Sequence, residues 1–229
     1  MERVPLQQKV LSENDRIAAR LREEFEKRGI LCLNFISSPG SGKTSLLERT
    51  LADFLKETPV GVLTGDIQTD NDARRLARYG FPVKQITTAG ACHLDARMVE
   101  HSIEDWDLDD FELLFIENVG NLVCPTSYDL GEASKIVVLS VTEGEDKPLK
   151  YPGIFHKSDL MVLNKMDLLP YVPFNVERAR GNARQINPGI DIVETSCLTG
   201  VGLAKWQAWL AERRSAAAAG ALHPSMAGV

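Results

Sequence analysis

Residues 35–44 read Phe35-Ile36-Ser37-Ser38-Pro39-Gly40-Ser41-Gly42-Lys43-Thr44, and this stretch decides the fold class. A mostly apolar run, 30–36, leads into it and a helix-forming run, 45–56, follows it, which is the strand, glycine loop and helix order of a phosphate-binding P-loop. Glycines let backbone N–H groups approach phosphate oxygens, and the helix N-terminus adds a partial positive charge. One position departs from the pattern G-x-x-x-x-G-K-[ST], because Ser37 stands where the first glycine is usual.

The loop also predicts which residues hold the phosphates. Lys43 is expected to reach the β- and γ-phosphates, and the Thr44 hydroxyl is expected to hold Mg²⁺. The alternative is an ordinary strand–turn–helix joint with a surface lysine, which leaves the glycines and the Lys-Thr pair unexplained. The other loop residues expected to bind the nucleotide are Gly40, Ser41, Gly42 and Ser45.

Composition and charge narrow the class of protein. The chain has 229 residues, of which 44% are hydrophobic and 25% charged, and these values suit one soluble α/β domain with or without appendages. The net charge of −6 argues against a nucleic-acid surface, which needs a basic footprint. No apolar run approaches the ~20 residues of a membrane span, and residues 1–9 lack a secretory pattern. We therefore expect a cytoplasmic protein without nucleic-acid or membrane partners, whose four cysteines are thiols, metal ligands or reactive groups.

Strand-like and helix-like runs alternate along the chain. This alternation predicts an α/β fold with a mostly parallel central sheet and helices on both faces. The expected organisation is an N-terminal helix at 1–29, a nucleotide and metal domain at 30–214 and a flexible tail at 215–229. The amphipathic helix, over 6–28, is expected to pack on the flank of the domain rather than to act as a partner-binding arm. The predicted strands are 31–37, 59–64, 83–87, 111–116, 136–141, 160–163 and 190–193, and the later helices are 45–56, 73–79, 92–101, 174–186 and 203–214.

The guanine-reading pattern N-K-x-D follows one of the later strands, as Asn164-Lys165-Met166-Asp167. The Asp167 carboxylate can accept hydrogen bonds from guanine N1–H and from the exocyclic amine, and adenine lacks this pair of donors. Lys165 is expected to lie over the base, and Asn164 is expected to brace the neighbouring loops. Thr195-Ser196-Cys197, after the last strand, resembles a second guanine loop. The predicted nucleotide is therefore GTP or GDP.

Acidic residues end two other strands and predict a magnesium site. Mg²⁺ prefers oxygen ligands and keeps several waters, so Asp66, Glu117 and Thr44 are candidate ligands, directly or through water. Asp72 is a candidate for positioning the attacking water, although a turn or capping role is the alternative for each aspartate. Gly120 is expected to donate its N–H to the γ-phosphate. The predicted catalytic set is Lys43, Thr44, Asp66, Asp72 and Glu117.

A second group of candidate ligands consists of Cys92, His93 and Cys124. Thiolate and imidazole ligands suit Zn²⁺, Ni²⁺ or copper rather than Mg²⁺. Spacing alone favours three unrelated residues: a buried thiol, a surface imidazole and a loop thiol. If they do bind a metal, a fourth ligand must be water or come from another chain. Cys124 follows Gly120 closely, so such a metal would be tied to the loop that senses the nucleotide.

Taken together, these motifs resemble HypB, the family of hydrogenase nickel-incorporation GTPases. The resemblance covers roughly residues 10–211 and combines the nucleotide motifs with the Cys-His and Cys-Pro motifs in one order. The stretches that carry it are 37–48, 65–72, Cys92-His93-Leu94, Glu117-Asn118-Val119-Gly120-Asn121-Leu122-Val123-Cys124-Pro125, 142–148 and Tyr151-Pro152.

The resemblance implies a P-loop GTPase of the dimer-activated SIMIBI type. It also implies a GTP-dependent homodimer with a nickel site, which zinc can also occupy, built from Cys92, His93 and Cys124 of two subunits. Nickel would be delivered, with a partner nickel metallochaperone, to a hydrogenase large-subunit precursor. Lys147 is expected either to reach a phosphate across the interface or to be a plain surface lysine. Some family members carry a tight N-terminal nickel site, and the absence of cysteine and histidine from 1–29 argues against one here.

Three alternatives remain at the level of sequence. A urease nickel-insertion GTPase has the same logic but carries a Cys-Pro-His metal motif, whereas Cys92 and His93 are adjacent here. A small-molecule kinase would use the P-loop with ATP, against which the N-K-x-D pattern argues. A metal-storage module without enzymatic activity would bind nickel independently of Lys43.

Overall fold

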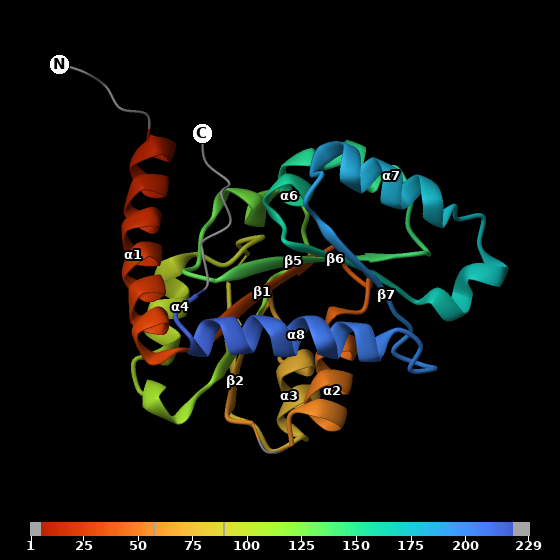
Figure 1. Ribbon diagram of the computed structural model, residues 1–229. Coiled ribbons are helices and arrows are strands. Elements are labelled where there is room, and N and C mark those ends of the chain that lie inside the picture. Colours follow the sequence, from red (N-terminus) through yellow and green to blue (C-terminus); the bar gives the residue numbers. More distant parts are fainter. Residues whose placement is uncertain (1–5, 57, 89, 222–229) are drawn as a thin grey trace.

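Seven parallel strands form one sheet in the order β3-β2-β4-β1-β5-β6-β7 (Figure 1). The structure is a computed structural model, and it describes residues 6–56, 58–88 and 90–221. The predicted α/β class with a parallel sheet is confirmed. The strands are β1 (Leu31–Ser37), β2 (Val60–Asp66), β3 (Val83–Thr87), β4 (Leu113–Glu117), β5 (Ser134–Ser140), β6 (Leu160–Asn164) and β7 (Asp191–Glu194).

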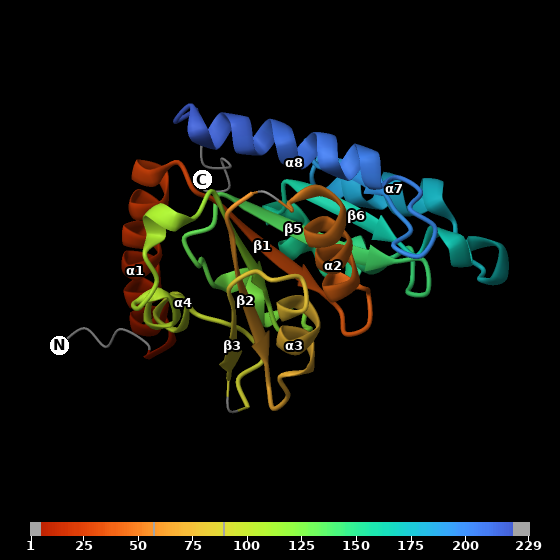
Figure 2. The same ribbon diagram turned by 90° about the horizontal axis from the view of Figure 1, so that it is seen from below.

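Helices cover both faces of the sheet (Figures 1 and 2). Helices α2, α3 and α8 contribute to the apolar cluster on one face, while α1 and α4, and further along α6 and α7, pack on the other. The helices are α1 (Leu6–Arg28), α2 (Lys43–Phe54), α3 (Asn71–Ala77), α4 (Ala96–Ile103), α5 (Lys147–Lys150), α6 (Pro152–Lys157), α7 (Val176–Ile186) and α8 (Leu203–Ala218), with short 3₁₀ turns at Leu108–Asp110, Cys124–Ser127 and Met166–Tyr171.

The central strand β1 explains why both faces need cover. All seven of its residues are buried, and successive side chains point to opposite faces. Leu31, Leu33 and Phe35 join the cluster beneath α2 and α8, whereas Cys32 joins the cluster beneath α1 and α4. A strand buried on both sides reads as a nearly continuous apolar run, which is the pattern seen in the sequence.

Helix α1 packs on the flank, as its amphipathic pattern predicts. Ile17, Leu21 and Phe25 are buried against α4 and the edge of the sheet. A fully buried side chain of this size contributes about 1.5–3 kcal/mol. Helix α1 is therefore packed on the domain and is not a detached arm.

Two predicted helix boundaries are wrong by four residues each, while the other predicted boundaries differ by at most two. Helix α4 begins at Ala96, not at Cys92, because the Asp95 side chain caps it by accepting a hydrogen bond from the N–H of Met98 at 2.8 Å. Helix α8 continues past Arg214 to Ala218, so the predicted tail at 215–229 begins inside a helix. Alanine has the highest helix propensity, and Ala217 is buried. Residues 222–229 lie outside the described residues, and for them the tail stays a prediction.

Candidate nucleotide and metal sites

A cleft of about 470 Å³ opens at the carboxyl end of β1, where the strand order reverses between β4 and β5. Most of the predicted phosphate and magnesium residues line it. Its walls come from the P-loop, the ends of β2 and β4, the start of α3 and one guanine-loop residue: Pro39, Gly40, Gly42, Lys43, Thr44, Ser45, Gly65, Asp66, Ile67, Asp72, Arg75, Glu117, Asn118, Val119, Gly120 and Lys165.

The P-loop is closely packed around its lysine. Lys43 is buried and donates from Nζ to the Ser37 Oγ at 2.9 Å, so the serine at the unusual position holds the lysine side chain. Burial lowers the pKa of Lys43, against the attraction of nearby carboxylates such as Glu117. Gly42 has φ of 98°, and a Cβ there would lie 2.4 Å from Nδ2 of Asn164. Only glycine therefore fits this turn without strain.

Thr44 and Glu117 meet at the base of the cleft. The Thr44 hydroxyl donates to Oε1 of Glu117 at 2.6 Å, and both residues are buried. The other carboxylate oxygen, Oε2, is buried without a hydrogen-bond partner among the described residues. Burial raises the pKa of Glu117 to about 7, although Lys43 and the Thr44 hydrogen bond oppose the rise. An unpartnered carboxylate oxygen beside a threonine hydroxyl fits a bound Mg²⁺.

The two predicted aspartates lie at the rim of the cleft. Asp66 Oδ1 accepts from the N–H groups of Gln68 at 2.9 Å and Thr69 at 2.7 Å. Partial burial acts to raise the pKa of Asp66, but these hydrogen bonds outweigh it and the pKa is lowered. Asp72, in the first turn of α3, pairs with Arg75 at 3.2 Å. Asp66 therefore stabilises a turn and Asp72 lies at the start of a helix, as the alternative interpretation of the aspartates expects. Both residues also line the cleft.

Arg75 is a cleft residue that sequence reasoning missed. Its guanidinium contacts Glu48 at 2.5 Å and the Ser45 hydroxyl at 3.3 Å, beside the P-loop. The only sequence signal was its position three residues after Asp72, a spacing that is common to ion pairs on the surface of helices and does not indicate a cleft.

The guanine-reading residues assemble at one side of the P-loop. Asn164 donates from Nδ2 to the carbonyl of Ser41 at 3.1 Å and accepts from the Thr195 hydroxyl at 3.1 Å, so it does brace two loops. Lys165, the one non-glycine residue with positive φ in the described chain, donates to the Gly40 carbonyl at 2.6 Å. The binding roles of these side chains stay predictions.

Asp167 lies with the second predicted guanine loop. It accepts a hydrogen bond from the Ser196 hydroxyl, which holds the carboxylate in place. The Cys197 thiol lies 3.5 Å from Oδ1 of Asn164, and burial raises its pKa to about 11. Asp167, Ser196 and Cys197 are not among the residues that line the phosphate cleft, and Ser196 is buried.

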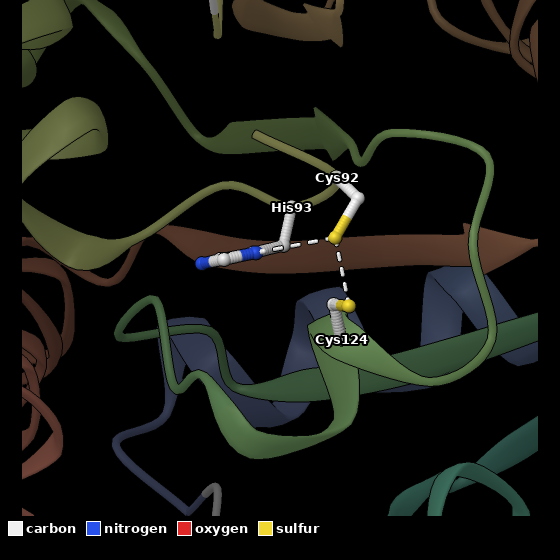
Figure 3. A group of neighbouring side chains, drawn as sticks. All are labelled: Cys92, His93 and Cys124. Atoms are coloured by element: carbon white, nitrogen blue, oxygen red, sulfur yellow. Dashed lines mark hydrogen bonds between the residues drawn. The ribbon is translucent and has the colours of Figure 1, made fainter. Parts of the chain in front are cut away.

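Cys92, His93 and Cys124 lie together in one chain (Figure 3). The two sulfur atoms are 2.7 Å apart, Sγ of Cys92 lies 3.8 Å from Nδ1 of His93, and all ligand atoms lie within 4.8 Å of one another. Burial lowers the pKa of His93, whose ring stacks on Tyr128 at 3.9 Å. The spacing argument that favoured three unrelated residues is wrong on proximity, because the loop before α4 and the turn after β4 both follow the carboxyl ends of parallel strands and meet there.

Lys147 reaches the P-loop of its own chain. Its Nζ lies 3.3 Å from the Ser38 Oγ and 3.4 Å from a carboxylate oxygen of Glu143. Glu143 also accepts from the Ser41 hydroxyl at 2.7 Å. The lysine is therefore at the phosphate loop, not on open surface, before any second subunit is present.

Comparison with known proteins identifies the family. The CobW/HypB/UreG nucleotide-binding domain matches residues 32–194. Hydrogenase maturation factor HypB of Azotobacter vinelandii is 53% identical over 211 residues, which are 91% of this chain and 69% of that protein. The chain belongs to the HypB family. The HypB of Escherichia coli (strain K12) is 52% identical over 207 residues, 90% of this chain and 71% of that protein.

Solved HypB structures have the same fold. HypB from Archaeoglobus fulgidus matches with a TM-score of 0.83 and 40% identity, over 89% of this chain and 99% of that chain. HypB from Helicobacter pylori in complex with nickel matches with a TM-score of 0.83 and 43% identity, over 89% of this chain and 95% of that chain. The predicted HypB-type P-loop fold is therefore confirmed. Among the described residues, no helix has the length and apolar character needed to cross a membrane.

Proposed function

We propose that this chain is a GTP-hydrolysing nickel metallochaperone that assists nickel insertion into a hydrogenase. The single observation that carries the proposal is the segment 117–124. Its first residue, Glu117, lines the phosphate cleft and accepts a hydrogen bond from the P-loop residue Thr44. Its last residue, Cys124, belongs to the thiol and imidazole group. A nucleotide that moves this segment changes the geometry of the metal ligands.

The catalytic roles follow from the cleft. Lys43, which donates to the Ser37 hydroxyl, would donate to a phosphate oxygen instead when the nucleotide binds. Gly120 lines the cleft, and its N–H would donate to the γ-phosphate. Mg²⁺, when bound, neutralises charge on the β- and γ-phosphates. Thr44, Glu117 and Asp66 would hold it, and Asp72 would orient the attacking water. The proposed reaction is the hydrolysis of GTP to GDP and phosphate.

The donor set supports nickel as the cargo. Two thiols and one imidazole suit Ni²⁺, and Zn²⁺ binds the same ligand types. Three ligands leave the coordination shell incomplete, so a second subunit is the proposed source of the rest. The solved relative from Helicobacter pylori is a nickel complex, which favours the same cargo here. The proposed further partners are a nickel metallochaperone and a hydrogenase large-subunit precursor, in the cytoplasm.

Light scattering tests the dimer. With Ni²⁺ and a non-hydrolysable GTP analogue, the mass is expected to rise from 25.3 kDa to twice that value, because the nucleotide orders the loops and the metal draws ligands from two chains. With GDP it is expected to return to the monomer. A mass that stays at the monomer value in both samples contradicts the dimer, and Lys43→Ala serves as the variant that cannot respond to the nucleotide.

Replacing Cys124 by alanine tests the metal ligands. Nickel affinity is expected to fall by more than about tenfold, since a coordinating thiolate is lost. Competition with a coloured chelator measures it. Cys32→Ala is the matched control, because this thiol is buried in the core away from the group, and burial raises its pKa. Equal nickel affinity in wild type and Cys124→Ala contradicts the assignment.

A urease-type role is favoured by the names of two relatives, one of them from Helicobacter hepaticus. The Helicobacter pylori relative, 43% identical over 215 residues, is named a hydrogenase/urease maturation factor. Delivery of nickel by this chain to an apo-urease distinguishes that role from service to hydrogenase alone. The kinase alternative has less support, because Asp167 suits guanine and not adenine.

A further inference from the structure

The segment from Glu117 to Cys124 accounts for only one of the metal ligands. Cys92 and His93 lie on a different loop, between β3 and α4, and nothing in the chain connectivity makes them follow the nucleotide. A coupled site needs a physical link between the two loops, since energetic coupling travels through contacts that have two arrangements. The described residues contain such a link.

The side chain of Asn118 joins the two loops. It follows Glu117 directly and is 1% exposed. Its Oδ1 accepts from the N–H of Leu94 at 3.2 Å and from the N–H of Val119 at 2.9 Å. Leu94 is the residue after His93. One amide oxygen therefore holds together the start of the cleft segment and the backbone next to a metal ligand.

The orientation of this amide is determined by its surroundings. Two backbone donors face Oδ1, so the amide nitrogen must face the other way, where it donates to Oδ1 of Asn34 at 3.3 Å. Asn34 lies on β1, the strand that enters the P-loop, and itself donates to Glu132 at 3.1 Å. Both asparagines are buried, so a flip of either amide would leave donors facing donors.

Leu94 is held on its other side as well. A Cβ placed on Gly65 would lie 2.8 Å from the Leu94 side chain, and Gly65 lines the cleft beside Asp66. Leu94 is therefore packed on one cleft segment through its side chain and bonded to another through its backbone. A second bond, from Nδ2 of Asn121 to the carbonyl of Cys92 at 3.3 Å, joins the same two loops nearer the surface.

A shift of the cleft segment must then do one of two things. Either Leu94 moves with Asn118 and carries His93 and Cys92, or the bond breaks and leaves a buried N–H unpaired. An unpaired buried donor is unfavourable, so the joint movement is preferred. We propose that Asn118 is the positioning residue through which the state of the nucleotide reaches Cys92 and His93. This inference rests on the proposed function, because it presumes that nucleotide and nickel binding are coupled.

The test measures nickel affinity twice for each protein, with GDP and with a non-hydrolysable GTP analogue, using Ni²⁺ alone and a competing chelator. The ratio of the two affinities is the coupling, and in wild type it is expected to be on the order of 5- to 150-fold. In Asn118→Leu, which has similar volume and no acceptor, the ratio is expected to fall to within about twofold of one. Asn118→Asp keeps the acceptor for Leu94 but loses the donor to Asn34, so its ratio is expected to lie between those of Asn118→Leu and wild type.

Asn187→Leu is the matched control. Its Nδ2 also bonds backbone carbonyls, including that of Ser158 at 2.9 Å, but it joins the end of α7 to the loop before β6, away from both loops. Its coupling ratio is expected to equal that of wild type. Circular dichroism checks that each variant is folded.

The outcomes separate the two proposals. A wild-type ratio of one overturns the coupled function and this inference with it. A wild-type ratio of the expected size that Asn118→Leu retains in full overturns the role of Asn118 alone. Hydrogen exchange on wild type gives an answer even if the variant does not fold: protection of the Leu94 amide is expected to change with the nucleotide by about tenfold or more. Identical protection with GDP and the GTP analogue contradicts the inference.

Discussion

Asp167→Asn is expected to change the preferred nucleotide from GTP to xanthosine triphosphate. In the proposed role the carboxylate would accept two hydrogen bonds from guanine, whereas an asparagine amide offers one acceptor and one donor. Xanthine has an oxygen where guanine has its exocyclic amine, so it matches the new pair. The loss of one bond to a charged group, together with an exocyclic amine left facing another donor, corresponds to about 3–6 kcal/mol, or roughly 100- to 10,000-fold weaker GTP binding.

The measurement is a fluorescence titration with labelled GTP, XTP and ATP. Folding should persist, because the asparagine oxygen can still accept from the Ser196 hydroxyl. Asp109→Asn makes the same chemical change at an exposed ion pair and should bind GTP as wild type does. Unchanged GTP affinity in Asp167→Asn, or tighter ATP than GTP binding in wild type, would remove the guanine assignment and revive the kinase alternative.

Glu117→Gln is expected to abolish most GTP hydrolysis while making the nucleotide-free protein more stable. The neutral amide keeps the shape and can accept from Thr44, but it is a poor magnesium ligand, so the rate should fall by about 100-fold or more. Steady-state phosphate release measures the rate. A variant that hydrolyses GTP at the wild-type rate contradicts the role of Glu117.

The stability effect has a definite sign. The pKa of Glu117 is raised from 4.5 to about 7 in the folded protein, so the folded state binds more protons than the unfolded state between these values. The contribution of Glu117 to the free energy of unfolding is therefore greatest below pH 4.5 and is lost as the pH rises through 7. The loss is on the order of 3 kcal/mol. Thermal melts without Mg²⁺ from pH 5 to 8 should show this decline in wild type and a flatter profile in Glu117→Gln.

The parts of the molecule that were predictable depend on local patterns. The P-loop at 35–44 and the N-K-x-D run at 164–167 each need only a strand, a turn and a helix or 3₁₀ turn, whose signals lie within a few residues. The buried strands were also predictable, because a short, continuous apolar run bounded by turn residues is typical of a strand buried on both faces. The start of α4 at Ala96 was predicted wrongly, because the cap at Asp95 depends on its hydrogen bond from the N–H of Met98, which the residue type alone does not reveal.

The parts that were not predictable depend on contacts between distant segments. Cys92 and Cys124 are separated by 32 positions, and their sulfur atoms meet only because the loops that follow β3 and β4 leave the same, carboxyl end of the parallel sheet. The bond from Leu94 to Asn118 and the contacts of Arg75 with Glu48 have the same origin. The last turn of α8, up to Ala218, was predicted as part of a tail for another reason. A run of small residues is also typical of a linker, and the burial of Ala217 that favours the helix is a tertiary contact.

The hydroxyl of Ser37 has a kinetic consequence. In most flexible loops, a lysine side chain must give up many rotamers when it meets its ligand, which costs up to ~2 kcal/mol. Here the ammonium group is already docked at 2.9 Å from Ser37, inside the loop. An incoming triphosphate replaces one oxygen partner by another and meets a preorganised cradle. The conformational entropy of the Lys43 side chain is thus lost during folding and not during nucleotide binding. We therefore expect the nucleotide to associate rapidly.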